Sequence, residues 1–67
     1  MARAFIGSME CPVKVDKDLG DNWAVTVYPA PPTPPFVVKL QGNDKEKATK
    51  GALEILQKSG KIDRFEM

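Results

Sequence analysis

The sequence contains no histidine and only one cysteine, Cys11, among its 67 residues. One cysteine cannot form an intramolecular disulfide, so the class of small secreted proteins held together by disulfides is excluded. The standard structural zinc sites and the Ser-His, Cys-His and His-metal catalytic arrangements are excluded as well. We therefore predict a protein that is not an enzyme and that uses no cofactor and no metal ion.

Long apolar segments are also lacking. No apolar run approaches the roughly 20 residues that a membrane span requires. The run Ala4-Phe5-Ile6 ends at Gly7 and is too short for the core of a secretory signal. We expect no membrane partner and a cytoplasmic location, and Met1 suggests a whole small protein.

Neither sign of charge is in large excess. Ten basic and nine acidic residues give a net charge of +1, and 42% of the residues are hydrophobic. This composition is typical of a chain that folds, and its length fits a single domain, residues 1–67. The charge is uneven, because residues 36–67 hold most of the lysines.

The first forty residues show the alternating pattern of strands. The segments Trp23–Tyr28 and Phe36–Gln41 alternate most clearly and are rich in β-branched and aromatic residues. One face of the predicted sheet would hold Trp23, Val25, Val27, Phe36, Val38 and Leu40, and the other would hold Ala24, Thr26, Tyr28, Val37, Lys39 and Gln41.

An earlier strand region, which includes Phe5–Ile6 and Val13–Val15, is interrupted by Gly7 and Pro12. It predicts either one broken strand or two short strands. Because proline lacks an amide hydrogen, we expect Pro12 in an edge strand or at a bulge.

Five of the six prolines lie in one segment, Pro29–Pro35, between the two clearest strands. Proline interrupts both helices and sheets, so this segment predicts an extended, polyproline-like connector. Its members Pro29, Pro32 and Pro35 would share one face of a polyproline helix.

Helical periodicity begins after Gly42. We predict a helix over residues 43–59, with Asn43 as its N-terminal cap and Gly60 as its C-terminal stop. Beyond it, Ile62 and Phe65 are expected to fold back on the core. The apolar stripe of the helix is predicted to consist of Ala48, Ala52, Ile55 and Leu56.

These elements predict an α+β fold of the order β-β-β-α. An antiparallel sheet of three to four strands would be covered on one face by a single C-terminal helix. The other face would contact water or a partner.

Two short features, an aspartate-rich segment and a single cysteine, suggest a calcium site and a reactive thiol, but the sequence supports neither. The segment Asp16–Asp21 is rich in aspartate, but Gly20 and Val27 occupy positions where a calcium-binding EF-hand loop would need other residues. Cys11 has no histidine to activate it and is expected to be a structural residue.

Two surfaces remain as candidates for binding. Lys45, Lys47 and Lys50 at the helix start could contact phosphates of a nucleic acid. Alternatively, an interaction patch on the second sheet face, formed by Tyr28, Pro32, Val37 and Lys39, together with the exposed edge strand, could bind another protein or a second copy as a homodimer.

The segment Lys45–Leu56 resembles the final helix of double-stranded-RNA-binding domains, which begins with lysines and continues through alanines. This resemblance implies phosphate binding by Lys45, Lys47 and Lys50, although no helix precedes the strands here. The path from Trp23–Tyr28 through the prolines to the helix also resembles HicB-type antitoxins, which bind a small toxin protein. We therefore predict a non-catalytic binding module for nucleic acid or protein.

Overall fold

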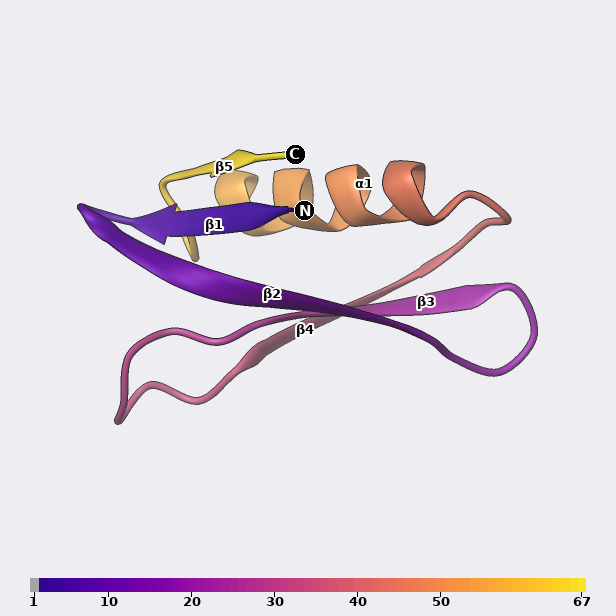
Figure 1. Ribbon diagram of the computed structural model, residues 1–67, viewed down its shortest axis with the longest axis horizontal. Helices are drawn as coiled ribbons and strands as arrows, with labels where there is room; N and C mark the ends of the chain where they lie inside the picture. Colours follow the sequence, from indigo (N-terminus) through magenta and orange to yellow (C-terminus); the bar gives the residue numbers. More distant parts are fainter. Residues whose placement is uncertain (1) are drawn as a thin grey trace.

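The computed structural model describes residues 2–67. Its elements follow the order β1 (Arg3–Ile6), β2 (Met9–Lys17), β3 (Asn22–Val27), β4 (Phe36–Gln41), α1 (Lys45–Lys58) and β5 (Arg64–Glu66). The strands form one antiparallel curled sheet in the spatial order β4-β3-β2-β1-β5, and α1 packs on one side of it (Figure 1). The α+β class is confirmed, but the described residues contain five strands instead of three to four.

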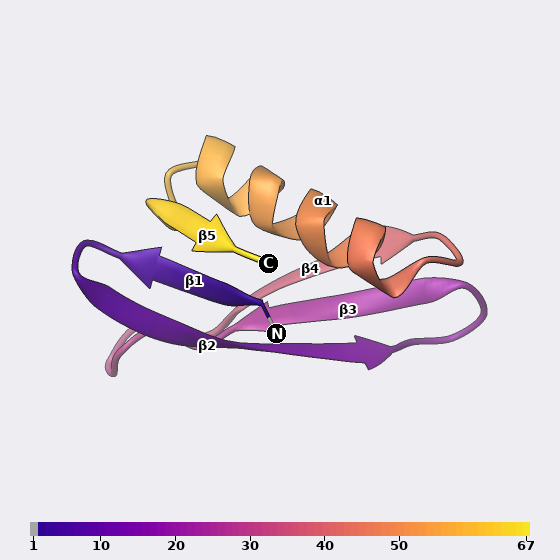
Figure 2. The same ribbon diagram turned by 45° about the horizontal axis from the view of Figure 1, so that its top comes forward.

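The additional strand is β5, which follows the helix. It pairs with β1 through Arg3–Glu66, Ala4–Phe65 and Phe5–Arg64, and Figure 2 shows the two strands side by side. The predicted return of the tail to the core is confirmed, since Ile62 is 2% exposed and Phe65 packs against the core. The sequence pattern did not reveal a strand because β5 has only three residues.

The N-terminal strand region forms two strands that meet at Gly7. Ile6 pairs with Met9, so Gly7 and Ser8 are the two residues of a hairpin turn. Gly7 has a φ of 61°, which a residue with a side chain rarely adopts. The alternative with two separate strands is therefore the correct one.

Pro12 lies within β2, a central strand, so its predicted place in an edge strand was wrong. The residues of β2 up to Pro12 pair with β1, and the residues from Val13 onward pair with β3. The carbonyl of Pro12 still accepts a hydrogen bond from the Tyr28 amide at 3.0 Å. Proline is tolerated because the one hydrogen bond that it cannot donate would lie at the end of the pairing between β2 and β3.

The proline segment is a turn and not an extended connector. The Thr33 amide donates to the Ala30 carbonyl at 3.2 Å, and the peptide bond between Pro31 and Pro32 is cis. This is the arrangement of a type VI turn. The turn is needed because Val27 and Phe36, which flank the segment, pair directly. Pro29, Pro32 and Pro35 therefore do not share one face of a polyproline helix.

The helix is capped by Asp44 and not by the predicted Asn43. The Asp44 carboxylate accepts hydrogen bonds from the amides of Glu46 at 3.0 Å and Lys47 at 3.3 Å. A negative charge here also interacts favourably with the helix dipole.

The predicted stop at Gly60 is confirmed. Gly60 has a φ of 80° and donates to the Gln57 carbonyl, while the Lys61 amide donates to the Leu56 carbonyl at 2.9 Å. These two bonds form a Schellman motif, which satisfies the last carbonyls of the helix.

The helix buries a different stripe from the predicted one. Ala48, Ala52 and Leu56 are buried as expected, but Ile55 is 47% exposed. Thr49 and Leu53 are buried instead. The core beneath α1 is built from β1, β2, β3 and the tail as well, and its fully buried residues include Ala4, Cys11, Val25, Val27 and Ile62.

Candidate functional site

The predicted interaction patch lies on the sheet face that α1 does not cover. In the strand register, Val37 pairs with Thr26 and Lys39 pairs with Ala24. These pairs alternate with the pairs that contribute buried Val25 and Val27 to the core. Val37 is 55% exposed and Tyr28, just after β3, is 40% exposed. The structure therefore brings these residues onto one outer face.

Pro32, the fourth residue of the patch, lies apart from the strands. It belongs to the turn that joins β3 to β4, where Pro31–Pro35 are all exposed. The patch is therefore a sheet surface with a proline turn at one end, and only its strand residues share a rigid support.

Lys39 is tied to the neighbouring turn by Asp18. The Lys39 ammonium lies 3.4 Å from an Asp18 carboxylate oxygen. The pKa of Asp18 is lowered, first by a hydrogen bond from the Leu19 amide and second by the positive charge of Lys39. Lys39 is thus oriented along the outer face, while most of its side chain remains exposed.

The outer edge of β4 has unpaired backbone groups, and the hydrogen bonds of β3 show which ones. The Tyr28 amide donates to Pro12 and the Asp18 amide donates to Asn22, so the even-numbered residues of β3 bond to β2. The odd-numbered residues of β3 therefore bond to β4, and the bond from Gly42 to Asp21 continues this alternation.

It follows that Phe36, Val38 and Leu40 direct their amides and carbonyls toward β3. The intervening residues Val37, Lys39 and Gln41 direct theirs outward. In the part of the chain that the structure describes, β4 is an end strand of the sheet, so nothing pairs with these groups. An exposed edge strand was predicted from the sequence, but neither which strand it is nor the direction of its backbone groups was.

Every second residue of β4 is apolar, and these residues form an apolar row along the open edge. Phe36, Val38 and Leu40 are only half-buried although they lie on the helix side of the sheet. The side of α1 next to β4 is identified by Gly51, since a Cβ placed there would lie 3.1 Å from the Leu40 Cδ1. Ile55 lies one turn further along the same side of α1 and is exposed.

The three lysines at the helix start do not form one cluster. Lys47 and Lys50 are separated by about 60° around the helix axis, whereas Lys45 lies about 140° or more from both. Lys45 lines a groove between α1 and β2, and Lys47 lines a small hollow beside Leu40. Among residues 2–67, none of the three lysines forms an ion pair.

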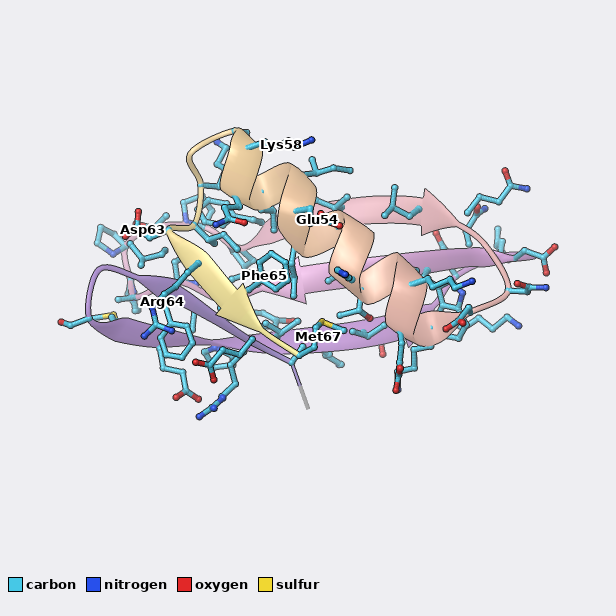
Figure 3. All side chains as sticks on the ribbon, turned by 90° about the horizontal axis from the view of Figure 1, so that it is seen from above. Glu54, Lys58, Asp63, Arg64, Phe65 and Met67 are labelled. Carbon is cyan, nitrogen blue, oxygen red and sulfur yellow. The ribbon has the colours of Figure 1, made fainter. Side chains whose placement is uncertain are left out.

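The groove beside Lys45 is the larger hollow, with a volume of about 550 Å³. Val13 and Val15 of β2 line it, as does Glu46, which follows Lys45 in sequence. Figure 3 shows Met67 beyond the end of β5, and this residue completes the wall. Among the described residues that line this mostly apolar groove, only Lys45 and Glu46 have charged side chains.

No group of three or more acidic or cysteine side chains in residues 2–67 is placed to hold a metal ion. Over the same range, α1 is too short and too polar to cross a membrane.

Comparison with known proteins adds no relative. No protein-family model, curated protein or solved structure gives a significant match to this chain.

Proposed function

We propose that this chain is a non-catalytic binding module whose partner is a protein that adds a strand to the open edge of β4. The observation that carries this proposal is the outward direction of the backbone groups of Val37, Lys39 and Gln41. Strand addition at such an edge derives affinity from main-chain hydrogen bonds and specificity from the neighbouring side chains.

The side chains around the edge are suited to a protein partner. Val37 and Tyr28 expose apolar surface on the outer face, and Ile55 exposes it on the helix side. A strand that docks on β4 would contact both sides at once. Short edge strands are often protected by charge, and here the one charged residue of β4, Lys39, is drawn toward Asp18.

Replacing Val37 by proline tests this proposal. The Val37 amide points outward, so V37P removes a hydrogen-bond donor from the open edge without removing a bond to β3. The matched control is V37T, which keeps the amide and the β-branched side chain. Partners captured by the wild-type chain would be purified and their dissociation constants measured for all three proteins by calorimetry.

We expect the V37P chain to bind each partner at least about tenfold more weakly than the V37T chain, because only V37P lacks the amide. Equal binding by V37P, with its circular dichroism spectrum unchanged, would refute strand addition at this edge.

Nucleic-acid binding is the second candidate, supported by the absence of ion pairs at Lys47 and Lys50 among the described residues. These two lysines lie within about 60° of each other on α1, and the resemblance to double-stranded-RNA-binding domains assigns them to phosphates. Against it stand the separate position of Lys45 and a net charge of only +1.

Fluorescence anisotropy with labelled duplex RNA and duplex DNA at about 50 mM salt tests this candidate. Binding should fall steeply as salt rises, and the double variant K47Q/K50Q should lose it. K14Q is the control, because Lys14 lies on the opposite sheet face beside Asp16. No binding at this salt concentration would end the hypothesis.

A further inference from the structure

We infer that the strand added to β4 is the β4 strand of a second copy of this chain, in an antiparallel pairing about a two-fold axis at Val38. This inference rests on the proposed function, because it names the partner of the same edge. Three properties of β4 favour a second copy: the spacing of its outward groups, the position of its charge and the row of half-buried apolar residues Phe36, Val38 and Leu40.

The outward groups of β4 are complementary to those of a second β4. In an antiparallel pair, residues that face each other with outward groups exchange two hydrogen bonds. If Val37 faces Lys39 of the second copy, the two-fold axis places Lys39 opposite Val37 of that copy as well. The pairing then satisfies the amides and carbonyls of both residues in both chains.

The charge of Lys39 favours this register over the one whose two-fold axis is centred on Lys39. A shift by one residue on each strand would centre the axis on Lys39 and place two ammonium groups directly opposite each other, which is unfavourable. With the axis at Val38, each Lys39 lies opposite an exposed valine. Its aliphatic stem can cover Val37, and its ammonium can remain near Asp18 of its own chain.

The same register joins the apolar rows on the helix side. Val38 faces Val38 of the second copy, and Phe36 faces its Leu40, so three half-buried residues of each chain gain apolar neighbours. A two-fold axis perpendicular to the sheet leaves both helices on the same side. Figure 3 shows α1 crossing the strands diagonally, with Lys58 on the β4 side. Each exposed Ile55 would therefore lie beside the shared part of the sheet.

A second copy fits this edge better than an unrelated strand because both sides of the interface obey the same pattern. The charged outward residue Lys39 lies two positions from the uncharged outward residue Val37, and half-buried Val38 lies between them. The two-fold axis at Val38 pairs these features with each other and repeats every contact.

Sedimentation equilibrium between about 10 µM and 1 mM protein tests the association, a range that covers affinities typical of weak interfaces. The expected result is a shift from the monomer mass of 7.4 kDa toward twice that mass. V37P should have a dimer dissociation constant roughly tenfold or more above that of V37T, since only V37P removes one interchain hydrogen bond in each copy.

Cysteine cross-linking tests the register and does not depend on the folding of V37P. Residues that face each other in such a pair have Cα atoms about 5.5 Å apart, which allows a disulfide. A mixture of V37C and K39C chains should form a covalent heterodimer under mild oxidation. Each variant alone should cross-link much less, and wild type should not, because Cys11 is buried.

The outcomes separate this inference from the proposed function. A monomer at every concentration overturns the second copy as partner, while strand addition would still be decided by the V37P comparison with captured proteins. A dimer that cross-links equally through V37C alone or K39C alone overturns the register at Val38. A dimer unaffected by V37P and without the mixed cross-link uses another surface and also overturns the inference.

Discussion

Leu40 occupies the space beside Gly51, with its Cδ1 3.1 Å from the place where a Cβ at position 51 would lie. The glycine therefore lets α1 approach β4 closely. Leu40 is half-buried in the open edge strand, so its flexible side chain can move by a few tenths of an ångström. The first prediction follows from this relationship.

G51A should raise the free energy of unfolding by up to about 0.5 kcal/mol, because the helix propensity of alanine outweighs a small movement of Leu40. G51V should lower it by roughly 1 kcal/mol or more, because a branched side chain cannot fit in the same space. Urea denaturation measures both. A G51A protein that is clearly less stable than wild type would show that the Leu40 side chain cannot move away from the added methyl group.

The second prediction compares Leu53 with Ile55. Leu53 is 0% exposed and Ile55 is 47% exposed, although both are large apolar residues of the same helix. L53A should lower the free energy of unfolding by about 3 kcal/mol, because it leaves a cavity in the core. I55A, measured in dilute protein, should lower it by less than about 1 kcal/mol. Similar losses from the two variants would contradict the observed orientation of α1.

The third prediction concerns the helix cap. D44A should lower the free energy of unfolding by about 1 kcal/mol, because two amides of the first turn lose their acceptor. N43A is the matched control and should change it by no more than about 0.5 kcal/mol. Thermal unfolding followed by circular dichroism would distinguish the two residues, and a larger effect of N43A would reverse the assignment of the cap.

The fourth prediction concerns the pKa of Asp18, which lies below the ordinary value for an aspartate. Because the folded state holds the proton less tightly than the unfolded chain, Asp18 favours the folded state above about pH 4. This contribution is lost as the pH falls through the folded pKa.

K39M should raise the pKa of Asp18 but leave it below the ordinary value, because the hydrogen bond from the Leu19 amide, the largest single cause, remains in place. Carbon-detected NMR titration of the Asp18 carboxyl measures both values. K14M is the control, since Lys14 lies near Asp16 instead. An unchanged Asp18 pKa in K39M would show that the ion pair has no effect on the titration.

The strands with regular alternation were predictable because their period depends only on the sequence. Phe36–Gln41 has the predicted bounds, and the burial of Val25 and Val27 follows the predicted faces. The stop at Gly60 was predictable for a similar reason, because few residues other than glycine adopt its positive φ.

The predictions from sequence were wrong where contacts between distant parts of the chain determine the local structure. Leu53 and Ile55 flank the same stripe, and Leu53 is the buried one because Ala4, Cys11 and Ile62 from β1, β2 and the tail share its core cluster. The prolines predicted a stiff segment, but the pairing of Val27 with Phe36 requires a turn there. The open groups of β4 depend on the hydrogen-bond register, which a pattern of side chains does not specify.

The pairing of β1 with β5 has a consequence for the order of folding. Arg3 and Glu66 are joined by a hydrogen bond at 2.5 Å although 63 positions separate them in sequence. Closing so long a loop costs more entropy than closing the short turns between β2, β3 and β4. The β1–β5 ladder should therefore form after those turns and open before them, so its amides should exchange with solvent first.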